Sequence, residues 1–153
     1  MKKINPVKLI EVLIAGYEDV ALARQKSQQL AVENGFSLLD QMRIVTATSE
    51  LARNIVIHAK QGQMSAYIIE KEGCDDKGFL LVFEDRGAGI RNVEEILRER
   101  DNSRNALCLG LPGVKRLSDE FHIHSVIGKG TKVEFTKWLQ QSTPVIQPIS
   151  AEL

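Results

Sequence analysis

The chain has 153 residues, of which 43% are hydrophobic and 26% charged, a composition typical of one soluble globular domain. Basic and acidic residues number 20 each, and this zero net charge argues against nucleic acid as the main partner, because binding to a phosphate backbone favours a basic excess. The N-terminal apolar run is interrupted by Lys8 and Glu11, so it predicts neither a signal peptide nor a membrane span, and Cys74 and Cys108 suit free thiols in a reducing, cytoplasmic compartment.

The first third of the chain predicts a strand followed by two helices. Residues 7–14 are rich in β-branched and aliphatic side chains and predict the strand. Residues 18–34 predict a helix that stops at a glycine, Gly35. Ser37 and Asp40 fit a helix-capping pattern, and the periodic apolar positions after them predict a long helix over residues 38–58.

The rest of the chain predicts two β-hairpins, with two short helices between them. The expected elements are strands at 64–70 and 79–84, a helix at 93–98, a polar mobile loop at 98–107, a helix from Gly110, and strands HIHSVI and TKVEFTKWL around GKG. This order predicts an α+β fold, a two-layer sandwich whose mixed, mainly antiparallel sheet carries helices on one face. We expect one domain over residues 1–139 and a disordered tail over residues 140–153.

Glu50 and Asn54 form the first candidate for chemistry. At positions i and i+4 they project from one face of the long predicted helix. The amide oxygen suits a hard cation and the carboxylate can accept a proton from an attacking hydroxyl, although a solvated polar stripe has the same pattern. His58 near the same predicted helix end is accounted for by the helix dipole.

Two glycine-containing segments form the other candidates. Asp85, Gly87 and Gly89 follow a predicted strand, where glycines permit positive φ and close approach to a ligand, or simply make a surface turn. The helix that starts near Gly110 offers free N–H groups and a positive dipole end to a phosphate, unless it is an ordinary helix start.

The order of these motifs resembles the nucleotide-binding domain of the GHKL superfamily. That superfamily has an E-x-x-x-N helix, a D-x-G-x-G turn, a glycine loop before a helix and a late G-T turn, and here the last is Gly130-Thr131. The stretches TATSELARNI, EDRGAGI, GLPGVKRLSDEF and GKGT are similar to the anti-sigma serine/threonine kinases, most of all the RsbT-type stressosome switch kinases. The resemblance covers roughly residues 7–139.

The resemblance implies ATP and Mg²⁺ as cofactors and a role for each matching residue. Glu50 would be the general base, Asn54 the Mg²⁺ ligand, and Asp85 the acceptor for the adenine amino group. The remaining nucleotide-binding residues implied in this way are Gly87, Gly89, Ile90, Gly110, Leu111, Gly113 and Thr131. Residues 98–109 would form a lid over the nucleotide.

The resemblance also implies an activity and partners, and one departure keeps a second function open. The first hypothesis is a protein serine/threonine kinase that phosphorylates STAS-domain antagonists and then activates a PP2C-type phosphatase. Similar kinases have a run of glycines before L-P-G, whereas Ala106, Cys108 and Leu109 lie within that stretch here. This difference favours the alternative, a binding-only regulator that sequesters a sigma factor or activates a phosphatase. Neither hypothesis involves nucleic acid or a membrane.

Overall fold

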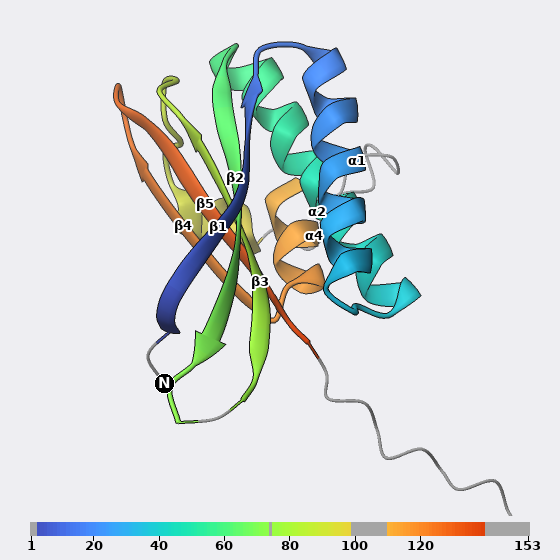
Figure 1. Cartoon of the computed structure of the whole chain (residues 1–153). Coiled ribbons are helices and arrows are strands. Elements are labelled where there is room, and N and C mark those ends of the chain that lie inside the picture. The colour runs from blue at the N-terminus through green and yellow to red at the C-terminus, as the bar shows by residue number, and fades with distance from the viewer. Residues whose placement is uncertain (1–2, 74, 99–109, 140–153) are drawn as a thin grey trace, which may run out of the picture.

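The computed structural model describes residues 3–73, 75–98 and 110–139, and it forms a sheet covered by helices on one face (Figure 1). The predicted disordered tail, most of the predicted lid, and both cysteines lie outside the described residues. In chain order the elements are β1 (Lys3–Ile14), α1 (Tyr17–Glu33), α2 (Leu38–Asn54), the π-helix η1 (Ile55–Ala59), β2 (Gly62–Lys71), β3 (Lys77–Asp85), α3 (Val93–Arg98), α4 (Gly110–Leu117), β4 (Glu120–Val126) and β5 (Gly130–Trp138).

The sheet has five strands in the order β1-β2-β3-β5-β4, and the predicted α+β sandwich is confirmed. Every neighbouring pair of these strands is antiparallel, so the described sheet is not mixed. The reason is that β4 forms the far edge and the last hairpin returns β5 between β4 and β3, antiparallel to both. This insertion makes Asp85 at the end of β3 the cross-strand partner of Thr131 at the start of β5.

The edge strand β1 is longer than the sequence predicts. It starts at Lys3 and runs through Pro6, whereas the apolar pattern predicted a start at residue 7. Proline lacks the N–H that a central strand requires, but an edge strand tolerates it. The register with β2 shifts between Ile4 and Val7, next to this proline, and the irregularity keeps the two flanking segments paired.

Helix α2 begins where the sequence predicts and ends earlier. The Ser37 hydroxyl accepts a hydrogen bond from the Asp40 N–H at 3.2 Å, which confirms the predicted cap. The α-helical geometry stops at Asn54, and residues up to Ala59 form the π-helix η1 instead of a continued α-helix. A π-turn changes the direction in which successive side chains point, and such turns are frequent at functional sites.

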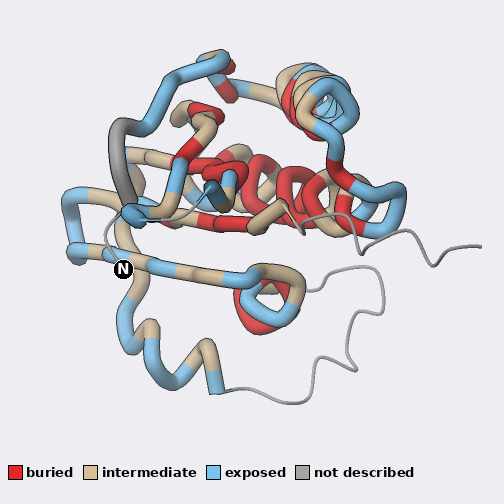
Figure 2. Tube along the Cα trace, turned by 60° about the horizontal axis from the view of Figure 1, so that its bottom comes forward, coloured by how far each residue is buried: buried red, intermediate tan, exposed pale blue. Residues whose placement is uncertain are grey.

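The hydrophobic core lies between the sheet and the covering helices. Its largest fully buried side chains include Phe79 and Phe135 from the sheet, Ile44 from α2 and Val114 from α4. Figure 2 shows the buried positions gathered in the interior and the exposed ones on the outer surfaces. Among the helices of the described residues, none has both the length and the apolar character needed to cross a bilayer.

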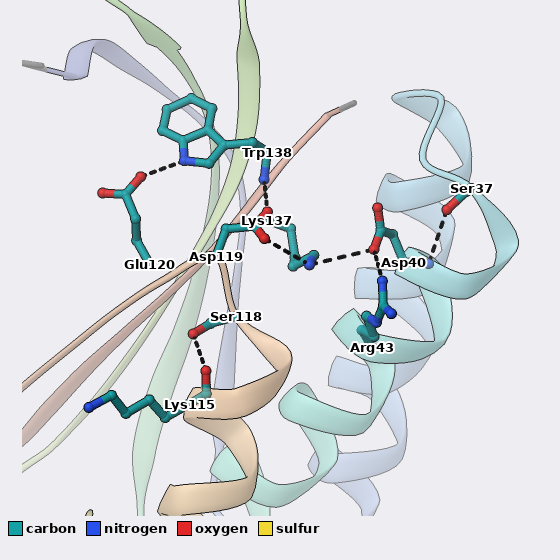
Figure 3. Close-up of polar contacts among 9 residues, drawn as sticks. All are labelled: Ser37, Asp40, Arg43, Lys115, Ser118, Asp119, Glu120, Lys137 and Trp138. Carbon is teal, nitrogen blue, oxygen red and sulfur yellow. Dashed lines mark hydrogen bonds and ion pairs between the residues drawn. The ribbon is translucent and has the colours of Figure 1, made fainter. Parts of the chain in front are cut away.

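A set of charged side chains joins the start of α2 to the sheet, and we call Asp40, Arg43, Asp119 and Lys137 the Asp40 cluster (Figure 3). Lys137 Nζ on β5 lies 3.5 Å from Asp40 Oδ1 and 3.1 Å from Asp119 Oδ1. Arg43 Nη1 lies 2.9 Å from the same Asp40 oxygen. The side chains of Lys137 and Asp40 are both 8% exposed. Two buried groups of opposite charge thus hold the first turn of α2 on the sheet.

Candidate functional site

A cavity of about 460 Å³ opens where α2 and β3 end and β5 begins, near the turn after β3. Its lining comprises Leu51, Asn54, Ile55, His58, Phe83, Asp85, Ala88, Gly89, Ile90, Arg91, Ile96, Gly110, Leu111, Thr131 and Val133. Most of these side chains are apolar, and the polar ones are few. Pockets for small organic molecules have this size and this character: apolar walls with a few polar groups that fix orientation.

The cavity brings together most of the predicted nucleotide-binding residues. Those that line it are Asn54, Asp85, Gly89, Ile90, Gly110, Leu111 and Thr131, contributed by segments far apart in the sequence. Glu50, Gly87 and Gly113 are not among the lining residues. Glu50 lies one helical turn before Asn54, Gly87 lies in the turn after β3, and Gly113 is buried on α4. These three residues therefore lie next to lining residues without lining the cavity themselves.

At the glycines of the turn after β3, the predicted positive φ is confirmed for Gly89, but the close backbone approach is to protein. Gly89 has φ +80°, and an added Cβ there would lie 2.4 Å from the Val126 carbonyl oxygen. An added Cβ on Gly87 would lie 2.8 Å from the Ala59 side chain. These glycines permit the turn to pack against η1 and the β4–β5 hairpin, so the close approach is to protein. That packing gives the cavity its wall.

Asp85 is held in place by its own turn. Its Oδ1 accepts the Gly87 N–H at 2.8 Å, which fixes the carboxylate at the end of β3. On the neighbouring strand, Gly130 fits because an added Cβ would lie 2.1 Å from the Asp85 carbonyl oxygen. The close packing of these two backbones keeps Thr131 beside Asp85 in the cavity wall.

Ser125 connects three parts of this wall, and the sequence analysis did not single it out. Its hydroxyl accepts the Ile90 N–H at 2.7 Å and lies 2.8 Å from the Thr131 hydroxyl. Ser125 and Thr131 are cross-strand partners of the final hairpin. The serine in HIHSVI carries no signal of this role by itself, because the register of the hairpin and the position of the turn after β3 together create it.

Glu50 is paired with a cation that the sequence analysis also missed. Glu50 is 6% exposed, and its Oε1 accepts a hydrogen bond from Arg53 Nη1 at 3.1 Å. The spacing of three residues on α2 was visible in the sequence and is a usual one for helical ion pairs. The burial of the carboxylate, which makes the pair consequential, was not visible.

His58 and Arg91 add basic side chains to the cavity lining, and neither was among the predicted site residues. The sequence interpretation of His58 as a residue at a helix end overlooked its spacing of four from Asn54. The π-helix keeps His58 at the cavity. The polar part of the lining thus combines an imidazole, a guanidinium, a carboxylate and an amide.

Comparison with known proteins agrees with this geometry. The family model described as "Histidine kinase-like ATPase domain" matches residues 13–137. The chain therefore belongs to the histidine kinase-like ATPase domain family, which is the GHKL-type assignment that the motifs predicted.

Relatives narrow the assignment within that family. The chain is 43% identical over 122 residues to the serine/threonine-protein kinase RsbT of Bacillus subtilis, covering 80% of this chain and 90% of that protein. It is 31% identical over 99 residues to an anti-sigma F factor of Caldanaerobacter subterraneus, covering 63% of this chain and 68% of that protein. Its fold is also that of the crystal structure of the RsbU and RsbW domains of a Mycobacterium tuberculosis protein, with a TM-score of 0.57, 21% identity, and coverage of 90% of this chain and 33% of the other.

Proposed function

We propose that this chain is an ATP- and Mg²⁺-dependent protein serine/threonine kinase of a bacterial partner-switching module. The observation that carries the proposal is the convergence of Asn54, Asp85 and Thr131 on one cavity, with the buried carboxylate of Glu50 one turn from Asn54. The family membership and the similarity to a protein named as a serine/threonine kinase support the same reaction.

The cavity suits a purine nucleotide because its polar and apolar parts are separated. Phe83, Ile90 and Val133 supply apolar surface for a planar base. Asp85 Oδ1 already accepts the Gly87 N–H, and the carboxylate retains capacity to accept a hydrogen bond from an exocyclic amino group. We assign Asp85 and Thr131 to the adenine and the amides near Gly110 to the phosphates.

Asn54 fits the role of a Mg²⁺ ligand. The described residues contain no cluster of three or more His, Cys, Asp or Glu side chains that could hold a metal. A nucleotide-bound Mg²⁺ does not require such a cluster, since it keeps several waters and takes one or two protein ligands besides the phosphates. When bound, the ion would neutralise charge on the triphosphate. Asn54 would orient it with one amide oxygen.

Glu50 fits the role of a general base toward a partner protein rather than toward the nucleotide. It lies outside the cavity lining but on the same helix face as Asn54. A carboxylate in this position can take the proton of a serine or threonine hydroxyl that approaches the phosphate end of the site. In this proposal Asn54, which lines the cavity, serves nucleotide binding, and Glu50, which lies outside the lining, serves proton transfer.

The proposed partners are STAS-domain antagonist proteins as substrates and a PP2C-type phosphatase that the released kinase activates. The anti-sigma F relatives make a sigma factor a further partner to test. A cytoplasmic location follows from this set of partners. These assignments rest on the resemblance to RsbT-type kinases and on the relatives.

The test is transfer of labelled phosphate from ATP, with Mg²⁺, to a STAS-domain protein encoded beside this chain. The proposal expects transfer by the wild-type chain and its loss in Asn54→Ala, because the variant removes the only amide oxygen assigned to the metal. Gln29→Ala is the matched control, since it also removes an amide but from exposed α1, where Gln29 contacts Glu33. Equal transfer by both variants would contradict the assigned role of Asn54.

The binding-only regulator is the alternative outcome of the same experiment. The replacement of glycines by Ala106 and Cys108, which lie outside the described residues, is the observation that favours it. Tight binding to a sigma factor or phosphatase without nucleotide, together with no transfer under any condition, would select this alternative.

A further inference from the structure

Glu50 and Arg53 form an ion pair in which the two carboxylate oxygens differ in their hydrogen-bond partners. Oε1 accepts the Arg53 guanidinium at 3.1 Å. Within the part of the chain that the structure describes, Oε2 has no hydrogen-bond partner. Among the described residues, the ion pair therefore uses one carboxylate oxygen and leaves the other without a partner.

The burial of the two side chains is unequal. The Glu50 side chain is 8% exposed and that of Arg53 is 34% exposed. An ionised carboxylate at this depth is unfavourable unless a cation and hydrogen bonds compensate for lost water. Arg53 supplies that charge from the solvent side of α2, while the cavity lies on the side of Asn54 and does not include Arg53 in its lining.

We propose that Arg53 is a positioning residue for Glu50, an inference that rests on the proposed kinase function. Arg53 holds Oε1 and keeps the carboxylate in one orientation. Glu50 Oε2 then takes the proton of the substrate hydroxyl while the substrate oxygen bonds to the γ-phosphorus of ATP. The bond from that phosphorus to the bridging oxygen breaks, and ADP leaves with its electron pair.

The same helix offers a matched control for this proposal. Arg43 and Asp40 are also three residues apart on α2, with an N–O distance of 2.9 Å and side chains 38% and 8% exposed. Asp40 lies more than two turns from Asn54 and has a second cationic partner in Lys137. Loss of Arg43 therefore removes a comparable ion pair without touching the site.

The experiment compares Arg53→Met, Arg53→Lys and Arg43→Met in steady-state phosphate transfer from ATP to the STAS-domain protein. Arg53→Met should lower kcat about 10- to 100-fold while the Kd for ATP and the KM for the STAS-domain protein stay within about threefold of wild type. Arg53→Lys, which restores a cation, should recover most of the rate. Arg43→Met should transfer at the wild-type rate.

Several results would overturn the positioning role. One is an unchanged kcat in Arg53→Met, and another is a raised KM with unchanged kcat, which would make Arg53 a contact to the partner. A third is a drop in melting temperature or ATP affinity that accounts for the lost rate, which would make the pair structural. If the wild-type chain itself transfers no phosphate, the proposed function fails first, and the two failures are thereby distinguished.

Discussion

Helix α2 carries two similar acid–arginine pairs near its opposite ends, and their surroundings differ. Near the start, Asp40 and Arg43 belong to the Asp40 cluster, where the buried Lys137 reaches Asp40 and Asp119 from the sheet (Figure 3). Near the end, Glu50 has Arg53 and no other hydrogen-bond partner among the described residues. Oδ1 of Asp40 is shared between two cations, one of them on the sheet, whereas Oε1 of Glu50 has a single arginine from its own helix.

The difference teaches that partners and surroundings, rather than burial alone, separate a carboxylate that ties α2 to the sheet from one proposed to act as a base. Both acids are nearly buried, at 5% and 6% exposure. The two cations at Asp40 Oδ1, one on α2 and one on β5, hold the helix start on the sheet. Glu50 has no such contact to the sheet among the described residues and lies one turn from Asn54 in the cavity lining, which is why it is the one proposed as a base. We therefore expect changes at the two ends to separate stability from catalysis.

The largest effect that sharpens this contrast is expected from Glu50→Gln. The amide keeps the shape of the side chain but is not a useful base, so phosphate transfer should fall about 10²- to 10⁴-fold. Arg53 loses its partner but is 34% exposed and stays hydrated, so the free energy of unfolding should change little. Initial rates of transfer and urea denaturation measure the two quantities.

Glu33→Gln provides the control for that variant, because Glu33 is an exposed acid at the end of α1 that contacts Gln29. It should leave both transfer and stability as they are. If Glu50→Gln instead unfolded at much lower urea and kept its transfer rate per folded molecule, the two ends of α2 would not differ in the way described.

The second effect belongs to the other end of the helix. Lys137→Met removes the buried cation of the Asp40 cluster from both Asp119 and Asp40. Breaking a buried pair in this way should lower the free energy of unfolding by about 2–3 kcal/mol, below the full cost because Arg43 remains and Asp119 is 38% exposed. Urea denaturation measures the loss. Transfer per folded molecule should stay at the wild-type value, and a selective loss of transfer would break the comparison.

The fold was largely predictable from the sequence because its signals are local. Apolar periodicity, the Ser37 cap and the glycine-rich final turn located the helices and strands. The exceptions came from context. The extension of β1 through Pro6 depends on an edge position, and the apolar period did not mark the change from α-helix to π-helix after Asn54.

The site was predictable only where a motif carried it. The motifs predicted that Asn54, Asp85 and Thr131 lie together, and the cavity brings them together, while the roles given to them stay predictions. Lys137, Ser125 and Arg53 were missed because each acts through a contact set by register or burial. Lysine in a strand is ordinarily exposed, and nothing in TKVEFTKWL marks Lys137 as buried opposite α2.

The smallest effect separates the start of α2 itself from the Asp40 cluster that holds it. Ser37 accepts the Asp40 N–H at 3.2 Å, and Ser37→Ala leaves that helix-terminal donor without its side-chain acceptor. The free energy of unfolding should fall by about 1 kcal/mol, the usual value of an N-cap. The ion pairs of Asp40 keep the helix in place, so transfer should not change.

In the double variant with Lys137→Met the two losses share Asp40, and urea denaturation should show a combined loss that differs from their sum. If the two losses in free energy of unfolding simply added, the cap and the Asp40 cluster would hold α2 independently. The start of the helix would then not act as one structural unit, and the comparison with the Glu50 end would fail.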